Sequence, residues 1–378
     1  MDYEIYIHIP FCKSKCSYCD FPSEAGKDNL MEAYTAALCR EIIDRAPELR
    51  EAGQVRSVYI GGGTPSVMPT PLMLQIVHTL RANLPIPYDT EFTVEMNPGT
   101  ADVECMMALQ TLGVNRVSFG AQSFKNELLK KIGRAHTAYD IRNAVKMARM
   151  ALINNVNIDL MYGLPGQTLQ DLKDSINEAI DVVSTHISIY GLTVEEGTPL
   201  AKAVEEGSIV LPDEDEVEAM YDYMVHRLSH VGFVRYEISN FARPGRESKH
   251  NLGYWQDVPY VGFGAAAHSY WKGWRTTNRR SMEEYIEAIA KGESPAEPEE
   301  EVTRERHMEE FCFLALRTAE GINKEKFRQT FGCEIGTVYE TVLKDLQAKG
   351  WLLDEPERVR LTEQGMKLGN MAFAEFLL

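Results

Sequence analysis

The first half of the chain alternates short β-branched or aromatic runs with longer stretches of helical apolar spacing. The runs predict strands at Glu4–Ile9, Arg56–Ile60, Glu91–Glu95, Asn115–Phe119, Asn157–Met161 and His186–Tyr190. The stretches between them predict helices at Leu30–Ala52, Leu72–Leu84, Val103–Leu112, Ile141–Leu152 and Leu169–Val183. Because strand–helix alternation builds parallel sheets, six such units predict an α/β fold with an incomplete, TIM-like (β/α)6 barrel.

The rest of the chain predicts further domains. Residues 1–200 are expected to hold the barrel, and residues 201–290 are expected to form an extension that covers the barrel mouth. Within this extension, the segment around residues 240–274 is rich in glycine, aromatic and polar residues. The acidic, proline-containing stretch 291–302 predicts a linker. Residues 303–378 predict a small, mainly helical, winged-helix-like domain that ends in a hairpin at Trp351–Leu361.

Three cysteines, Cys12, Cys16 and Cys19, stand at the spacing C-x3-C-x2-C. Three thiolates this close can hold three irons of one [4Fe–4S] cluster and leave the fourth iron open to a substrate. The spacing resembles that of the radical S-adenosylmethionine (SAM) enzymes. The alternatives are a zinc site, which normally needs a fourth Cys or His nearby, and a buried trio without a ligand. No fourth ligand follows Cys19 in its loop, so the ligand count favours the cluster.

Composition narrows the class of protein. The formal net charge of −17 argues against a general nucleic-acid binder, because phosphate contacts need clustered Lys and Arg. Four further cysteines are scattered and the total of 7 is odd, which argues for a reducing compartment and against a disulfide framework. We expect a cytoplasmic protein, since the sequence shows no leader and no apolar run approaching the roughly 18 residues of a membrane span.

Polar and glycine residues come at the C-terminal ends of the predicted strands, where barrel chemistry is built. The backbone of Gly61–Thr64 can approach a ligand that a Cβ would block, although a tight strand-to-helix turn would explain it too. Glu95 and Asp159 are costly to bury unpaired. They can accept hydrogen bonds from SAM, or form a structural ion pair with Arg134, which could instead hold the SAM carboxylate.

Several motifs together resemble the HemN/HemW group of radical SAM proteins over almost the whole chain. They are Tyr6–Cys12, the cysteine triad, Gly61–Ser66, Glu95–Gly99, Gly120–Phe124 and Asp159–Gly166. The resemblance implies that Cys12, Cys16 and Cys19 ligate the cluster. It also implies contacts with SAM at Tyr6, Gly62, Gly63, Thr64, Glu95, Gln122, Arg134 and Asp159, and further ones at Thr193 and His268.

Two branches of this group differ in sequence. The anaerobic coproporphyrinogen III oxidase branch carries a further cysteine two residues after the third and an additional N-terminal segment. Here Phe21 takes the place of that cysteine, and the first strand is expected to begin at about residue 4. By contrast, His250-Asn251-Leu252-Gly253-Tyr254-Trp255 resembles the HNxxYW signature of the heme-chaperone branch.

His250 can be an axial ligand of heme iron, with Tyr254 and Trp255 offering apolar surface to a porphyrin. The alternative is a histidine with a purely structural role. We therefore expect a heme chaperone that holds a [4Fe–4S] cluster, SAM and heme, passes heme to acceptor proteins, and can form a homodimer. The competing hypotheses are a coproporphyrinogen III oxidase and a radical SAM enzyme with an unrelated substrate, because a barrel fixes the cofactor and not the substrate.

Overall fold

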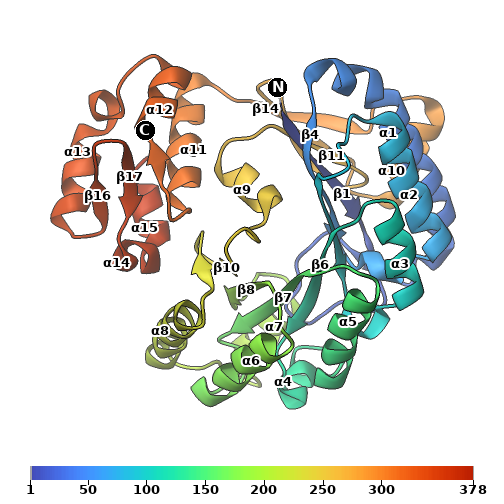
Figure 1. Cartoon of the computed structure of the whole chain (residues 1–378), viewed down its shortest axis with the longest axis horizontal. Coiled ribbons are helices and arrows are strands. Elements are labelled where there is room, and N and C mark those ends of the chain that lie inside the picture. Colours follow the sequence, from blue (N-terminus) through green and yellow to red (C-terminus); the bar gives the residue numbers. More distant parts are fainter. Residues whose placement is uncertain (1, 378) are drawn as a thin grey trace.

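The computed structural model describes residues 2–377. Six parallel strands lie side by side in chain order and form the partial barrel that the alternation predicts (Figure 1). They are β1 (Tyr3–Ile9), β4 (Val55–Gly62), β5 (Glu91–Met96), β6 (Arg116–Gln122), β7 (Asn155–Tyr162) and β8 (His186–Gly191). The outer layer contains α1 (Met31–Ala52), α2 (Thr70–Asn83), α3 (Val103–Thr111), α5 (Ala138–Met150), α6 (Leu169–Asp181) and α8 (Glu214–His230).

Short elements fill the connections of the barrel. They are β2 (Phe11–Cys12), β3 (Glu24–Ala25), α4 (Asn126–Lys131), α7 (Pro199–Glu205) and the 3-10 helices η1 (Asp28–Leu30), η2 (Pro65–Val67) and η3 (Pro98–Thr100). Strand β2 pairs with β3 directly after β1 and brings Cys12 to the end of the barrel. Helices α5 and α6 both begin with capping boxes, at Thr137 and Thr168. These caps satisfy backbone N–H groups that a helix start leaves unpaired.

The two faces of β1 differ in chemistry. Ile5, Ile7 and Ile9 are buried in the main hydrophobic core beneath the helices. The alternate residues face the barrel interior, where Tyr6 stacks on Tyr59 of β4 with 6.4 Å between ring centroids. Because successive side chains of a strand point to opposite faces, one strand serves both an apolar outer layer and a polar interior.

The sheet continues beyond both ends of the barrel to a total of 12 strands. Strand β11 (Tyr260–Phe263) runs parallel to β1, and β12 (His268–Trp271), β13 (Trp274–Asn278) and β14 (Ala296–Glu301) follow in antiparallel order. At the other edge β10 (Asn240–Ala242) pairs with β8 and β9 (Val234–Arg235) with β10. The segment 201–290 therefore adds short strands to both edges of the sheet, and it also contains α8 and further helices. That this segment covers the barrel mouth stays a prediction.

The predicted linker 291–302 is wrong for most of its length. Its residues include the end of α10 (Met282–Lys291) and the whole of β14, which is hydrogen-bonded to β13. The acidic, proline-containing composition suits an edge strand as well as a linker, since charge and proline are tolerated where one side faces solvent. The pairing shifts register between Arg275 and Thr276, next to Pro298.

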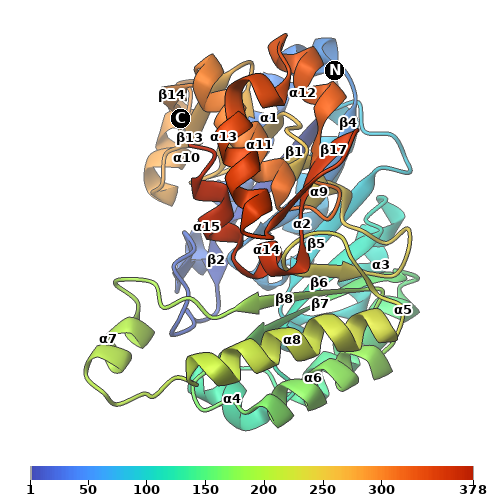
Figure 2. The same cartoon turned by 90° about the vertical axis from the view of Figure 1, so that its left-hand side faces the viewer.

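Helix α9 (Lys249–Trp255) lies between the sheet and the C-terminal domain (Figure 1), packing on both β4 and α11. The C-terminal domain has the expected helices and hairpin. It stands beside the barrel in Figure 1 and in front of its upper part in Figure 2. Its elements are α11 (Arg304–Leu316), β15 (Ile322–Asn323), α12 (Lys324–Phe331), α13 (Ile335–Ala348), β16 (Leu352–Asp354), β17 (Arg358–Leu361), α14 (Glu363–Lys367) and α15 (Gly369–Ala374). The domain has a hydrophobic core separate from that of the barrel.

Phe327 tests the independence of the C-terminal core. Its ring is fully buried against Phe311 and Phe331. We expect Phe327→Ala to lower the free energy of unfolding of this domain by about 3–5 kcal/mol, because it leaves a cavity. In a thermal melt the domain's transition should move down, while Leu353→Ala, at a side chain that is 40% exposed in the same domain, should shift it little. Equal shifts for the two variants would contradict this.

Candidate functional site

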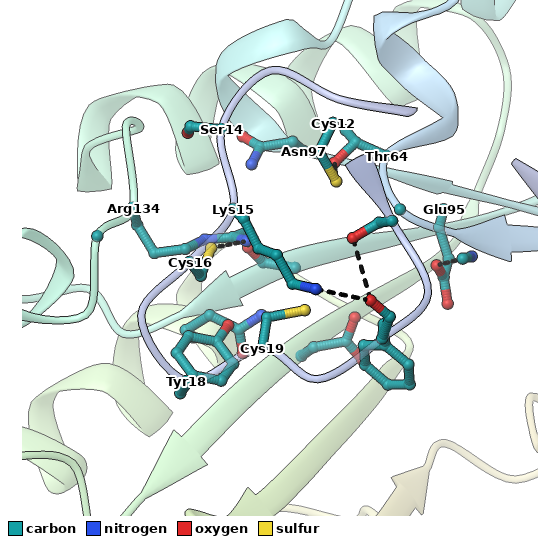
Figure 3. Close-up of a pocket in the computed structure, with 18 of the residues that line it drawn as sticks. Cys12, Ser14, Lys15, Cys16, Tyr18, Cys19, Thr64, Glu95, Asn97 and Arg134 are labelled. Atoms are coloured by element: carbon teal, nitrogen blue, oxygen red, sulfur yellow. Dashed lines mark hydrogen bonds between the residues drawn. The ribbon is translucent and has the colours of Figure 1, made fainter. Parts of the chain in front are cut away.

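A cavity of about 530 Å³ opens at the C-terminal ends of the barrel strands (Figure 3). Most of the site residues predicted from the sequence line it together. They are Cys12, Cys16, Cys19, Gly62, Gly63, Thr64, Glu95, Gln122, Arg134, Asp159 and Thr193. The structure thus gathers residues from the barrel strands β4, β5, β6 and β7, and from β2 and the connecting loops, at one opening.

The cysteine loop forms one wall of this cavity. Cys12 is buried, Cys16 and Cys19 are half-buried, and all three thiols are free. The backbone N–H of Ser17 donates to the carbonyl oxygen of Ile132 at 3.2 Å, which ties the loop to the end of α4. Burial raises the pKa of the Cys19 thiol, and the neighbouring Cys16 and Cys12 raise it further. The three sulfurs therefore share one electrostatic environment, in which a positive cluster would favour their thiolate forms.

Arg134 faces the cysteines. Its Nη1 donates to Cys16 Sγ at 3.5 Å and its Nη2 donates to the carbonyl oxygen of Gly120. Burial alone would lower the pKa of Arg134, but Tyr18 and Cys16 raise it above its ordinary value. Among residues 2–377 its Nε has no hydrogen-bond partner. A buried guanidinium with an unused donor can bind the carboxylate of a ligand.

The glycine loop is built by contacts within the protein. Gly62 has φ +112°, and a Cβ there would lie 2.6 Å from the His8 ring. A Cβ on Gly61 would lie 2.9 Å from the Glu95 carboxyl, and one on Gly63 would lie 2.7 Å from the Phe11 carbonyl oxygen. Close packing of this loop on β1 and β5 is thus enough to require glycine at these positions. That a ligand also requires them stays a prediction.

Two carboxylates lie deep in the cavity. Glu95 accepts hydrogen bonds from Tyr59 Oη at 2.7 Å and from the Gly62 N–H at 3.2 Å. Burial, with Asp159 adding to it, raises the pKa of Glu95 to about 7. Asp159 accepts from Ser118 at 3.0 Å and from Asn157 at 2.7 Å. Within the described chain neither carboxylate forms an ion pair with Arg134, so the structural ion pair considered from the sequence is not formed.

Three predicted residues do not line this cavity. Tyr6 lies behind Tyr59 and its hydroxyl bonds His8 Nδ1 at 3.0 Å. His268 stands on β12 with a side chain that is 61% exposed, 2.8 Å from Thr277 Oγ1. His268 does not line the cavity in this structure, and its contact with SAM stays a prediction.

His250, the third, is buried inside the barrel below the cavity. Its Nδ1 lies 2.8 Å from Ser57 Oγ and its Nε2 lies 3.1 Å from Tyr254 Oη. Its ring stacks on Tyr59 with 5.1 Å between centroids. Burial lowers the pKa of His250 to about 3, so the imidazole is neutral, the form that binds metal ions. Trp255 at the other end of α9 faces outwards, with the Arg317 guanidinium 4.6 Å from its ring.

The sequence analysis does not predict Tyr59 as a site residue, because its strand shows only the aromatic and β-branched composition of any buried strand. The available signal was its register, since Tyr59 and Gly61 lie two residues apart and thus on the same face of β4. Its hydroxyl holds Glu95 while its ring covers His250. Tyr59 therefore lies between the cavity, which it lines, and His250, which its ring covers.

Comparisons with known proteins identify the relatives of this chain. Residues 6–179 match the family model of the Radical SAM superfamily, and residues 302–368 match that of the HemN C-terminal domain. The protein named heme chaperone HemW of Bacillus subtilis is 40% identical over 98% of this chain and 98% of its own. The chain belongs to the HemW family of radical SAM proteins. The HemW of Escherichia coli is 33% identical over 99% of this chain and 97% of its own.

The HemW fold is shared with a solved structure. Coproporphyrinogen III oxidase (HemN) from Escherichia coli superposes with a TM-score of 0.87 at 21% identity, over 99% of this chain and 89% of the oxidase chain. This likeness confirms the barrel and its C-terminal domain. Within residues 2–377, no helix combines the length and the apolar character that crossing a membrane requires.

Membership of the HemW family and the radical SAM superfamily implies a [4Fe–4S] cluster and SAM. The residues present fit both groups. Three free thiols on one loop could supply three cluster ligands. Arg134 has an unused buried donor, and Glu95 and Asp159 offer acceptors in the same cavity. In the described part of the chain, no three His, Cys, Asp or Glu side chains are grouped so that they could hold a single metal ion.

Loss of one thiol tests the cluster. We expect Cys16→Ser to abolish the brown iron–sulfur absorption and to lower the iron content of the purified protein, because two thiolates hold a cube poorly. Cys105→Ser, which removes a half-buried free thiol on α3, should retain both. An unchanged iron content in Cys16→Ser would contradict the cluster assignment.

The predicted contact of Glu95 with SAM would make SAM binding depend on pH. Below a pKa of about 7 the Glu95 carboxyl is protonated and would no longer attract the ammonium group of SAM. We expect the affinity for SAM to fall by up to about tenfold per pH unit below that pKa, measured by equilibrium dialysis. Glu95→Gln should remove the dependence and Glu41→Gln, at a buried carboxyl outside the cavity, should keep it. A pH-independent affinity in the unaltered protein would refute this role.

Proposed function

We propose that the protein is a heme chaperone, which binds heme and passes it to acceptor proteins. The observation that carries this proposal is full-length similarity to proteins named heme chaperone HemW, at up to 40% identity. A residue of the cavity also supports the chaperone proposal over the oxidase. Phe21 stands where the oxidase pattern has a further cysteine, and its side chain is 62% exposed. We therefore propose no oxidase activity, and a cytoplasmic protein that can form a homodimer.

The cavity is the proposed site of the cluster and SAM. Cys12, Cys16 and Cys19 would hold the cluster, and Arg134 would face the SAM carboxylate beside Cys16. The remaining proposed SAM contacts in the cavity are Gly62, Gly63, Thr64, Glu95, Gln122, Asp159 and Thr193. Tyr6 would act from behind Tyr59. When bound, the cluster supplies an electron that can cleave SAM.

His250 is the proposed axial ligand of heme iron. Its neutral imidazole is the right donor, but both ring nitrogens are hydrogen-bonded and the residue is 1% exposed. Iron binding uses the lone pair of a ring nitrogen, so one of these hydrogen bonds must break. Helix α9 carries His250 and Tyr254 and must therefore shift before heme can bind there.

Heme titration tests the function. We expect saturable, near-stoichiometric binding to the cluster-containing protein under anaerobic conditions, followed by the Soret band. His250→Ala should weaken binding by at least about tenfold or change the ligation spectrum, because it removes an iron ligand. His186→Ala is a matched control, since His186 is also buried in the barrel with both ring nitrogens hydrogen-bonded, to Asn157 and Tyr236.

Two outcomes would contradict the proposal. Equal, unsaturable binding by the unaltered protein and by His250→Ala would mean nonspecific adsorption of heme. Formation of vinyl porphyrin from coproporphyrinogen III, in the presence of SAM and a reductant, would establish the oxidase instead.

A further inference from the structure

The cavity and His250 share one side chain. Tyr59 donates from its hydroxyl to Glu95 Oε1 at 2.7 Å, and its ring lies against His250 at a centroid distance of 5.1 Å and an interplanar angle of 21°. On its other side Tyr59 stacks on Tyr6. The position of Glu95 in the cavity therefore depends on a ring that α9 supports from below.

Helix α9 is held in the barrel by its N-terminus. The Glu91 carboxylate on β5 accepts hydrogen bonds from the backbone N–H groups of Lys249 and His250, each at 3.0 Å, and from Ser248 Oγ at 3.3 Å. Carboxylates stabilise helix N-termini through such bonds and through the helix dipole. While these bonds hold, His250 remains beneath Tyr59 with both ring nitrogens occupied.

A second carboxylate makes this arrangement costly. Glu4 on β1 is fully buried, and neither of its oxygens has a hydrogen-bond partner within residues 2–377. The helix backbone presses on it, since a Cβ on Gly253 would lie 1.9 Å from Glu4 Oε1. His250 Nδ1 lies 3.8 Å from Glu4 Oε2, and the nearest guanidinium nitrogen, Arg56 Nε, lies 4.0 Å from Glu4 Oε1. Departure of α9 would open Glu4 to water and so relieve the cost of burying it.

Polar contacts join the outer side of α9 and the residues just after it to the C-terminal domain. Trp255 packs on the Arg317 guanidinium, and His307 Nε2 lies 2.7 Å from Asp257 Oδ2 just after the helix. Lys326 Nζ donates to the Gln256 carbonyl oxygen. Such contacts between domains can separate without unfolding either core, because water replaces polar partners at modest cost.

We propose that Tyr59 makes SAM and heme binding antagonistic, because SAM needs α9 inside the barrel and heme needs it outside. With α9 inside, the His250 ring supports Tyr59, and Tyr59 fixes Glu95 for SAM. With α9 outside, His250 presents a free nitrogen to heme iron, and Glu95 loses its positioned partner. The inference rests on the proposed function, in that it takes His250 as the heme ligand and Glu95 as a SAM contact.

The coupling is reciprocal, as two ligands that select different states of one protein require. Saturating SAM should raise the apparent dissociation constant of heme, and heme should raise that of SAM by the same factor, about fivefold or more. Tyr59→Phe keeps the ring over His250 but removes the hydroxyl that holds Glu95. This positioning variant should still bind heme through His250, while the factor falls towards one.

The experiment is a hemin titration of the full-length, cluster-containing protein with and without saturating SAM, repeated for Tyr59→Phe. Tyr285→Phe is the matched control, since Tyr285 is a buried tyrosine that donates to a buried carboxylate, Glu41, at 2.6 Å outside the cavity. The control should keep the full SAM effect. An unchanged heme affinity with SAM, or an equal SAM effect in Tyr59→Phe, would overturn the antagonism.

The failures of the two proposals are distinguishable. If SAM has no effect while His250→Ala still loses heme, the antagonism fails and the chaperone proposal stands. If His250→Ala binds heme as the unaltered protein does, the ligand assignment fails and takes the antagonism with it.

Hydrogen exchange gives a test that needs no substitution. The amides of residues 249–255 should exchange faster in the heme complex and more slowly in the SAM complex than in the free protein, because exchange reports opening of the helix. Equal protection of this helix with heme and with SAM would overturn the proposal. Glu4→Leu, which replaces the unpartnered carboxylate with an apolar side chain, should shift the balance towards SAM and weaken heme binding.

Discussion

The hydrogen bond from Tyr59 to Glu95 connects two regions of the barrel interior, the cavity and the surroundings of His250. Above it lies the cavity with the cysteine loop, and below it lies His250 on α9. The bond exists because β4 and β5 are neighbouring parallel strands whose inner faces carry polar side chains. Glu95 is half-buried at the wall of the cavity, so losing this donor would leave its carboxylate one hydrogen bond short.

A polar interior imposes its own order on the barrel. Asn157 bonds Ser118, Asp159 and Ser188, while His186 joins it to Tyr236. Such a network must be nearly complete, since each unpaired buried group costs free energy. The exceptions are informative for that reason. Among the buried side-chain atoms without a hydrogen-bond partner within residues 2–377, the Glu4 oxygens lie at the α9 contact and the Arg134 Nε lies in the cavity.

The sequence predicts those parts that follow from local pattern. The alternation of strands and helices fixes the order of six strands, and chain order then brings Glu95, Gln122 and Asp159 to the same end of the barrel. The cysteine spacing needs no tertiary information at all. By contrast, β14 reads as a linker because edge-strand composition resembles that of an exposed loop, and its pairing with β13 is non-local.

The position of His250 shows why a motif alone could not define its site. His250, Tyr254 and Trp255 lie close together in the sequence. In the helix that they form, however, their side chains do not all point to the same side. Tyr254 lies with His250 inside the barrel, and Trp255 faces the C-terminal domain. Residues one apart on a helix do not face each other. The residues of this motif thus lie on two sides of α9. A porphyrin therefore cannot contact both His250 and Trp255 while α9 stays in its present position. A heme site that uses the whole motif requires α9 to move. The same movement takes the His250 ring away from Tyr59, which then no longer holds Glu95 in place in the cavity.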